Sequence, residues 1–255
     1  MNSFCYMIRS RGYFPENYKY LKTQNSQVYI STWLEDHMYQ DWFTLMYHPN
    51  TTWGEGRNKL LSYTKNKNYD YYIFLDDDLR FDVKKQIPIL EKDLTENNIK
   101  IAYPRRQDRY GNNEKFSKQH NCDASFSIFH KSIVRKLLPY YNAYQNDSWH
   151  YSQAILNMIQ NIVYQDITVQ YNDILFKNGT EKSYVQRGCN PEYIASILKK
   201  DILHPRFSNY TISQMYSRPK DIRWKSKPNT EISLTDYLRL DSEYIKEKER
   251  FWNDG

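Results

Sequence analysis

Glycine and cysteine are scarce in this chain of 255 residues, which contains 7 Gly and 3 Cys. Cys5, Cys122 and Cys189 are odd in number and widely spaced, which argues against a disulfide framework and favours a reducing compartment. The sequence has no Cys-x-x-Cys pair, so it gives no indication of structural zinc. We therefore expect a cytoplasmic protein, located in the host cytoplasm if its source is a virus.

Long apolar runs and dense basic blocks are also absent. No stretch approaches the roughly 20 apolar residues of a membrane helix, and the N-terminus lacks the apolar region of a signal peptide. The formal charge is +6, but the basic residues are scattered, unlike those of nucleic-acid-binding arms. We expect no membrane span and no nucleic-acid partner. The charge fits an anionic small ligand, and it also fits a weakly basic surface without a specific partner.

Tyrosine is the abundant residue, with 25 copies. Its rings can stack on sugars or bases, and its hydroxyl groups can form hydrogen bonds with them. Charged residues make up 26% and hydrophobic residues 40% of the chain, which are ordinary values for a soluble globular protein. The length is sufficient for one sizeable hydrophobic core with a small appended segment.

A run of apolar and aromatic residues from Tyr71 to Leu75 predicts a buried strand, and it ends in Asp76, Asp77 and Asp78. Three adjacent carboxylates repel one another and cannot all stay ionised in a dry interior. They are expected at an edge where water or a cation meets them. Alternate residues of an extended chain share a side, so the first and third carboxylates can face one divalent ion, of the Mg²⁺ or Mn²⁺ type. A solvated acidic turn is the alternative.

Three runs upstream also predict strands, namely Phe4 to Ile8, Val28 to Trp33 and Trp42 to Tyr47. Each is followed by polar residues, and Arg9 and Arg11 follow the first. Such an arrangement suggests a sheet whose carboxyl edge forms a site.

A helix is expected from about Gly54 to Lys67, where glycines permit a tight entry and Arg57 near the start can reach a phosphate. Followed by the strand that carries the aspartates, this helix makes a right-handed parallel crossover. Downstream, the same reasoning predicts a helix from Val83 to Asn97, a strand from Ile99 to Tyr103 ended by Pro104, a mobile loop from Arg105 to Gln119, a strand from Asp123 to Phe129, a helix from His130 to Tyr141, a helix opened by Asn146 or Asp147, and a strand from Ile167 to Tyr171.

The last part of the chain differs in composition. From about Ser217 it is charged and interrupted by Pro219 and Pro228, and it ends in a Glu/Lys-rich helix near residues 241–252. We expect one domain over residues 1–215, with a nucleotide-sugar half (1–103) and an acceptor half (104–215). Residues 216–255 are interpreted as a C-terminal helical tail or linker.

These motifs, in this order, resemble the GT-A glycosyltransferases over roughly residues 1–210. Arg57-Asn58 and the Asp-x-Asp motif at Asp76 to Asp78 are similar to the nucleotide-sugar half of that family. The strand from Asp123 to His130, followed by Leu137-Leu138-Pro139, is similar to its acceptor side. The chain is also similar to a small glycosyltransferase domain of large algal viruses. The resemblance implies an α/β, Rossmann-like GT-A fold, with a mixed, mostly parallel sheet flanked by helices.

The resemblance also implies a chemistry: transfer of a hexose or deoxyhexose from a nucleotide-diphosphate donor, a UDP-sugar by preference, to a glycan or glycoconjugate hydroxyl. Mn²⁺ or Mg²⁺ would stabilise the leaving diphosphate. Asp78 would be the direct metal ligand, Asp76 would contact ribose or metal, and His204 would complete the metal shell.

The acceptor hydroxyl must lose a proton as it attacks, and Asp147 is the candidate base, which implies inversion at the anomeric carbon. An alternative role of Asp147 or Asn146 is to cap the following helix. Asp123 is the second candidate for the base. The candidate donor contacts are Arg9, Arg11, Thr32, Arg57, Asp76 and Asp77.

Other classes fit less well. A nucleotidyltransferase acting on sugar phosphates would need a Gly-rich basic loop, which Arg9-Ser10-Arg11-Gly12 matches poorly. A metal-dependent phosphatase or nuclease would need a second group of metal ligands. A non-catalytic carbohydrate-binding module would not need alternating strands and helices.

Overall fold

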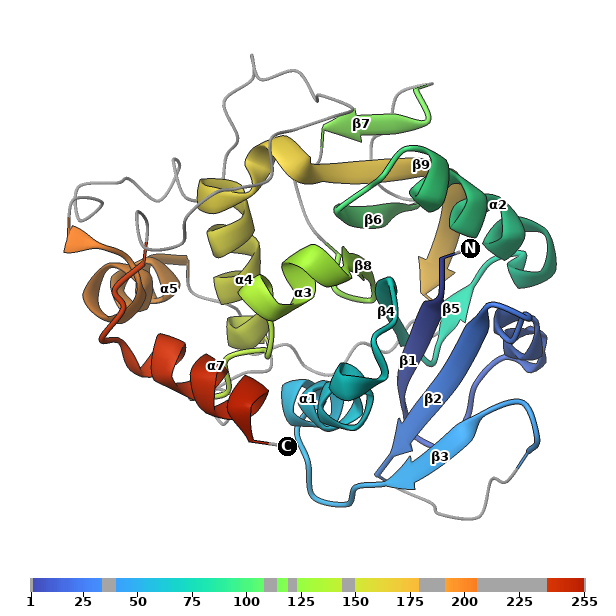
Figure 1. Cartoon of the computed structure of the whole chain (residues 1–255), viewed down its shortest axis with the longest axis horizontal. Coiled ribbons are helices and arrows are strands. Elements are labelled where there is room, and N and C mark those ends of the chain that lie inside the picture. Colours follow the sequence, from blue (N-terminus) through green and yellow to red (C-terminus); the bar gives the residue numbers. More distant parts are fainter. Residues whose placement is uncertain are drawn as a thin grey trace.

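A mixed sheet of nine strands forms the centre of the protein (Figure 1). The computed structural model describes residues 2–33, 40–107, 114–118, 123–143, 150–178, 191–205 and 238–254. The strand order is β3-β2-β1-β4-β8-β6-β9-β5, with β7 also paired to β9. Strands β3, β2, β1, β4, β6 and β9 run in one direction, and β8, β5 and β7 run antiparallel to their neighbours.

The described strands have the following bounds: β1 (Phe4–Ser10), β2 (Ser26–Thr32), β3 (Thr44–Tyr47), β4 (Tyr71–Asp76), β5 (Leu79–Arg80), β6 (Ile101–Arg106), β7 (Phe116–Lys118), β8 (Phe126–His130) and β9 (Thr168–Asn178). The described helices are η1 (Glu16–Leu21), α1 (Trp53–Thr64), η2 (Lys65–Lys67), α2 (Val83–Glu96), α3 (Lys131–Leu137), α4 (His150–Val163), η3 (Gln165–Ile167), α5 (Pro191–Ile197), η4 (Leu198–Ile202) and α7 (Glu243–Asn253).

Local sequence accounts for how the helices next to the site begin. Thr52 caps α1 in a capping box, since its hydroxyl accepts from the Glu55 amide and the Glu55 carboxylate accepts from the Thr52 amide. Asp82 caps α2 in a similar way, by accepting from the amide of Lys85. These caps fix the residue at which each helix begins.

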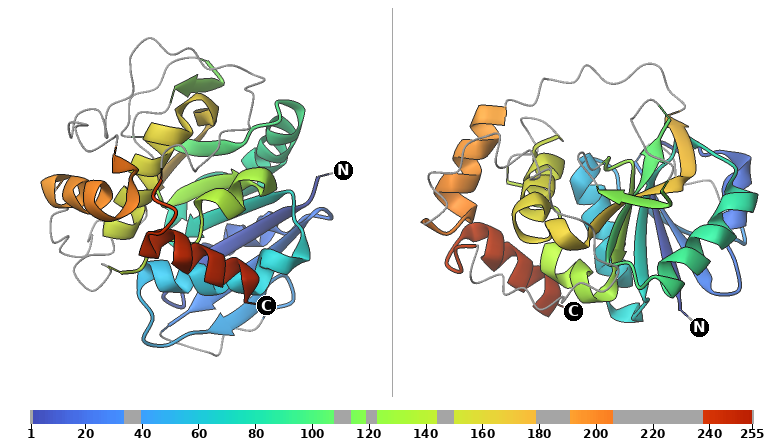
Figure 2. Two further views of the ribbon diagram at one scale, coloured as in Figure 1. Left: turned by 60° about the vertical axis from the view of Figure 1, so that its left-hand side comes forward. Right: turned by 90° about the horizontal axis from the view of Figure 1, so that it is seen from above.

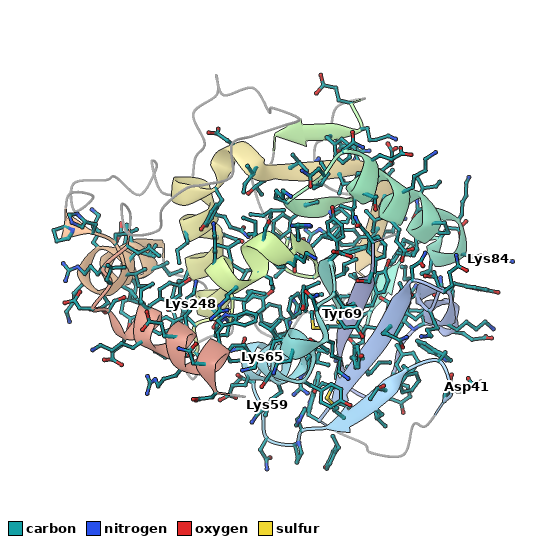
Figure 3. The ribbon with its side chains drawn as sticks, in the orientation of Figure 1. Asp41, Lys59, Lys65, Tyr69, Lys84 and Lys248 are labelled. Atoms are coloured by element: carbon teal, nitrogen blue, oxygen red, sulfur yellow. The ribbon has the colours of Figure 1, made fainter. Side chains whose placement is uncertain are left out.

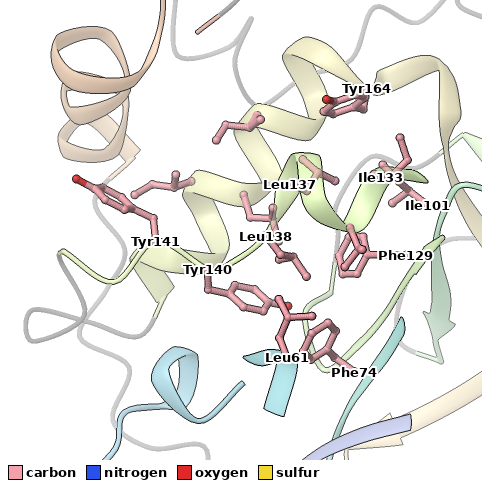
Figure 4. Close-up of a cluster of buried hydrophobic side chains, with 14 of the residues drawn as sticks. Leu61, Phe74, Ile101, Phe129, Ile133, Leu137, Leu138, Tyr140, Tyr141 and Tyr164 are labelled. Carbon is pink, nitrogen blue, oxygen red and sulfur yellow. The ribbon is translucent and has the colours of Figure 1, made fainter. Parts of the chain in front are cut away.

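Helices cover both faces of the sheet, as the view from above shows (Figure 2). Helix α2 and η1 lie on one face, and α1, α3 and α4 lie on the other, with α5 and α7 outside them. Two apolar cores correspond to the two faces. Because both faces are covered, β1 and β4 are buried along nearly their whole length. In the larger core, the ring of Phe74 packs against the rings of Phe129 and Tyr140, and Leu137 of α3 belongs to the same cluster (Figure 4).

Helix α7 belongs to the segment that the sequence suggests is a tail, yet it packs on the same core. Tyr244 is 2% exposed. Trp252 donates through Nε1 to the carbonyl of Leu138 at 2.8 Å. Lys248 is buried between α7 and the rest of the core, and its amine donates to the carbonyl of Lys136 (Figure 3). These contacts make α7 part of the folded unit, while the predicted boundary at residue 215 lies outside the described residues.

The strand from Ile99 to Tyr103 was expected to stop at Pro104, and this prediction is wrong. Strand β6 continues to Arg106, and its register with β9 shifts between Pro104 and Arg105. A bulge at this point accommodates a residue that has no amide hydrogen to donate. The predicted loop from Arg105 to Gln119 is also partly wrong, since residues 116–118 form β7 and pair with β9.

None of the described helices is long and apolar enough to cross a membrane.

Candidate active site

The carboxyl ends of β1, β2 and β4 bring the predicted donor-binding residues to one edge of the sheet. In the parallel ladders, Arg9 lies opposite Asp76 on one side and opposite Ser31 on the other. Thr32 lies opposite Ser10, one residue further along. Side chains that follow different strands in the sequence are therefore neighbours in space, as expected for the carboxyl edge of a parallel sheet.

Asp76 is the last residue of β4, and its carboxylate is held by two donors. Nη2 of Arg57 lies 2.7 Å from Oδ1, and Nε1 of Trp53 lies 3.2 Å from the same oxygen. Burial raises the pKa of Asp76 to about 6, although Arg57 and Trp53 act in the opposite direction, and the nearby Asp78 adds to the increase. The side chain is 27% exposed, so the carboxylate borders solvent as well as the protein interior.

The chain turns directly after Asp76, and this turn is tied down from β1 and η1. The hydroxyl of Tyr18 donates to the carbonyl of Asp76 at 2.9 Å and to that of Leu79 at 3.3 Å. The amide of Arg11 donates to Oδ2 of Asp77 at 2.7 Å. Burial is the main cause that raises the pKa of Asp77, partly offset by this hydrogen bond. Asp77 therefore holds the loop after β1, and Asp78 is half-buried beside it.

Arg57 is a fully buried arginine of α1, and its partners come from three other segments. Besides Asp76, its guanidinium donates through Nη1 to the Ala124 carbonyl at 2.7 Å and to the Tyr140 hydroxyl at 3.1 Å. It also lies 4.0 Å from the centre of the Trp53 ring. With no exposed surface, this guanidinium is placed to hold Asp76 and not to meet a phosphate in this conformation.

Arg9 is 3% exposed and links the ends of β1 and β2 to the loop before α1. Its Nη1 donates to the Ser31 hydroxyl at 2.9 Å, and Nη2 donates to the Thr51 hydroxyl at 2.6 Å. The guanidinium lies 4.3 Å from the centre of the Trp33 ring. Burial lowers the pKa of Arg9 to about 10, while Asp77 acts in the opposite direction. Thr32 is also buried, and its hydroxyl has no hydrogen-bond partner among the described residues.

Of the two candidate bases, Asp123 lies within the described residues. Asp123 lies in the turn before β8, where Oδ1 accepts from the amide and hydroxyl of Ser125 and Oδ2 lies 3.3 Å from Nη1 of Arg106. The same Ser125 accepts a hydrogen bond from the amide of Asp76 at 2.9 Å. Asp123 is therefore fixed near the aspartate triplet. Asp147 lies outside the described residues, as does Asn146.

His204 follows η4, in a part of the chain held by the pairing of Leu203 with Leu238. Among the described residues, no three His, Cys, Asp or Glu side chains form a group that could hold a metal ion. In this conformation His204 does not join Asp76 and Asp78 in such a group. Two carboxylates alone still fit Mg²⁺ or Mn²⁺, because these ions are commonly held by one or two carboxylates with substrate phosphates and water.

The sequence reasoning missed Trp53 and Tyr140 as parts of this site. Trp53 immediately precedes the Gly-x-Gly stretch, so its position beside a predicted helix start was a usable signal. Tyr140 lies 83 residues after its partner Arg57, and no local pattern links the two.

No protein-family model matches the sequence, and no curated protein matches it. Among solved structures, TarS of S. aureus is similar, with a TM-score of 0.52 and 10% identity, over 78% of this chain and 40% of TarS. The fragment of TarS that spans residues 1–349 gives a TM-score of 0.54 and 8% identity, over 84% of this chain and 70% of the fragment.

A glycosyltransferase involved in the glycosylation of the major capsid of PBCV-1 gives a lower TM-score of 0.41, with 16% identity over 70% of this chain and 94% of that protein. At such identities, structural likeness shows the fold alone. The chain has the GT-A-type fold that the sequence predicts, and it spans less than half of the length of TarS.

Proposed function

We propose that this protein is a glycosyltransferase that moves a sugar from a nucleotide-diphosphate donor to a glycan hydroxyl. The observation that carries the proposal is the position of the aspartate triplet, at the carboxyl end of β4 and directly beside the basic end of β1. On an open α/β sheet, ligands bind outside the carboxyl ends of the strands. Anionic and cationic side chains at this edge suit a diphosphate with its counter-ion.

In the proposed site, Asp78 and the second carboxylate oxygen of Asp76 would hold Mn²⁺ or Mg²⁺, and His204 would join them only after a change of conformation. Such an ion would supply the positive charge that stabilises the departing diphosphate. Arg11, which is half-buried, is proposed to contact the donor, and the buried Arg9 and Thr32 lie at the same edge of the sheet.

For the acceptor side, we propose Asp147 as the base that takes the proton from the attacking hydroxyl, which gives inversion at the anomeric carbon. Asp123 is the second candidate for this role. The donor is proposed to be a UDP-sugar that carries a hexose or deoxyhexose, the acceptor a glycan or glycoconjugate, and the place of action the cytoplasm.

A panel of nucleotide sugars, incubated with and without Mn²⁺ and acceptor glycans, tests the proposal by the release of free nucleotide. We expect release from at least one UDP-sugar, dependent on Mn²⁺ and increased by an acceptor. A nucleotidyltransferase would instead release pyrophosphate from a nucleoside triphosphate and a sugar phosphate. A carbohydrate-binding module would release neither product, and that result would refute the proposed activity.

A further inference from the structure

We propose that Arg57 is a positioning residue, which fixes the carboxylate of Asp76 so that a metal-bound nucleotide meets it in one orientation. The inference rests on the proposed function, which makes Asp76 part of the donor site. It concerns a residue that touches neither donor nor acceptor, because the guanidinium is fully buried.

The Asp76 carboxylate is held through one of its two oxygens. Among the residues that the structure describes, both of its side-chain hydrogen bonds fall on Oδ1, from Arg57 and from Trp53. A carboxylate has lone pairs on both oxygens. With Oδ1 occupied, Oδ2 is the oxygen left for a ligand, and the plane of the carboxylate is set by the two donors.

Arg57 is itself held by contacts with other segments. Its Nη1 atom is fixed by the Ala124 carbonyl and the Tyr140 hydroxyl, and its flat face packs on the ring of Trp53. Tyr140 in turn exchanges two backbone hydrogen bonds of 2.8 Å with the side chain of Asn58. The guanidinium therefore has little freedom to rotate. Because it is fixed by these contacts, it holds the carboxylate of Asp76 at the end of β4 in one position.

Arg57 also brings a positive charge to the aspartate triplet. Three adjacent carboxylates repel one another, and Arg57 offsets one negative charge at a distance of 2.7 Å, where water cannot intervene. No other Arg or Lys side chain in the described residues forms an ion pair with Asp76. Loss of Arg57 would leave the Asp76 carboxylate held by Trp53 alone and would increase repulsion within the triplet. Residues that orient a metal ligand typically affect metal affinity or activity by 10- to 100-fold when they are replaced.

The test is a double-mutant cycle on the binding of UDP in the presence of Mn²⁺, measured by calorimetry on the full chain. The variants are Arg57→Met, Asp76→Asn and the combination of both, with Arg57→Lys as a conservative form that keeps the charge. We expect Arg57→Met and Asp76→Asn each to weaken binding at least tenfold. The double variant should bind less than twofold more weakly than Asp76→Asn, because Arg57 acts through Asp76. Arg57→Lys should recover part of the loss.

Leu94→Ala serves as the matched control for lost stability. Leu94 is fully buried in α2 on the opposite face of the sheet, so this variant unfolds more easily without touching the site. It should bind Mn²⁺-UDP as the unmodified protein does. Circular dichroism shows whether each variant is folded. If Arg57→Met does not fold, Arg57→Lys takes its place in the double-mutant cycle with Asp76→Asn.

The outcomes separate the two proposals. If the unmodified protein binds no nucleotide with any metal, the proposed function fails. If it binds and Arg57→Met binds equally well, the positioning role alone is refuted. Effects of the two substitutions that multiply in the double variant would also refute it, because they would show that Arg57 acts independently of Asp76.

Discussion

Gly56 leaves the space that the side chain of Arg9 occupies. A Cβ atom built on Gly56 would lie 2.2 Å from Nε of Arg9, closer than such atoms approach in proteins. The guanidinium cannot simply move aside, because Ser31 and Thr51 hold it and the ring of Trp33 packs on it. The glycine at this position of α1 is therefore required by a close approach between a helix and the end of β1.

The substitution Gly56→Ala should consequently displace Arg9. We expect the free energy of unfolding to fall by about 1–3 kcal/mol, as for other overpacked sites, despite the better helix propensity of alanine. Urea unfolding measures the loss. Ser62→Ala, at an exposed position of the same helix, is the control and should change stability by less than about 0.5 kcal/mol. Equal stability of the two variants would contradict the close contact.

Asp78→Ala should abolish Mn²⁺-dependent donor binding, with a loss of 100-fold or more, because it removes the proposed direct metal ligand. Calorimetry with a UDP-sugar in the presence of Mn²⁺ or of a chelator measures the effect. Asp82→Ala is the control: it removes the cap of α2 and costs about 1 kcal/mol of stability, but should leave donor affinity unchanged. Unchanged metal-dependent uptake by Asp78→Ala would refute its role.

The identity of the base can be tested by Asp147→Asn and Asp123→Asn. If Asp147 is the base, its replacement should preserve donor affinity and reduce transfer by 100-fold or more, because only proton acceptance is lost. Asp123→Asn should weaken the ion pair with Arg106 and lower stability more than turnover. Calorimetry for donor affinity and product formation for turnover distinguish the two effects. Full turnover by Asp147→Asn would transfer the assignment to Asp123.

Stability should depend on pH through Glu91, which is buried in α2 and accepts a hydrogen bond from Tyr6 at 2.8 Å. Burial raises the pKa of Glu91 to about 7, against an ordinary value of 4.5. The folded protein therefore keeps this proton where the unfolded chain has lost it. The stability that this bound proton contributes is fully present below pH 4.5 and is lost as the pH rises through 7, by about 3 kcal/mol in the free energy of unfolding.

Glu91→Gln should remove that part of the pH dependence and be more stable than the unmodified protein at pH 8. Urea unfolding between pH 4.5 and 8 measures the slope. Glu96→Gln, exposed on the same helix, should keep the slope of the unmodified protein. A slope that persists in Glu91→Gln would assign it to another group.

Helix α7 should be required for the fold. Tyr244→Ala removes a fully packed ring from the core, and we expect a cost of about 3–5 kcal/mol in the free energy of unfolding. Truncation before residue 238 should expose the same core and give aggregation or unfolding. Lys246→Ala, exposed on α7, is the control with little effect. If the truncated chain unfolds as cooperatively as the full chain and at the same urea concentration, that result would support the tail interpretation instead.

Much of the fold could be predicted from the sequence because it depends on local patterns. The apolar run before Asp76 specified β4, the apolar stretches near residues 4, 28 and 42 specified β1 to β3, and residues 83–97 specified α2 almost to its ends. The carboxyl edge with Arg9, Thr32 and the aspartates also followed, because parallel strands place their ends together. The continuation of β6 past Pro104 could not be predicted from local patterns, because only the pairing with β9 and its bulge allow a proline there.

The sequence by itself thus determined most of the order of strands and helices and the acidic edge, since these follow from composition and short-range periodicity. The GT-A-type fold followed from the resemblance of its motifs to that family. Only the tertiary structure decided that Arg57 is buried against Asp76, that Tyr140 and Trp53 complete its surroundings, and that α7 covers the core. These relationships join residues far apart in the chain. No local pattern encodes them, because they arise from which layers pack together once the sheet has formed.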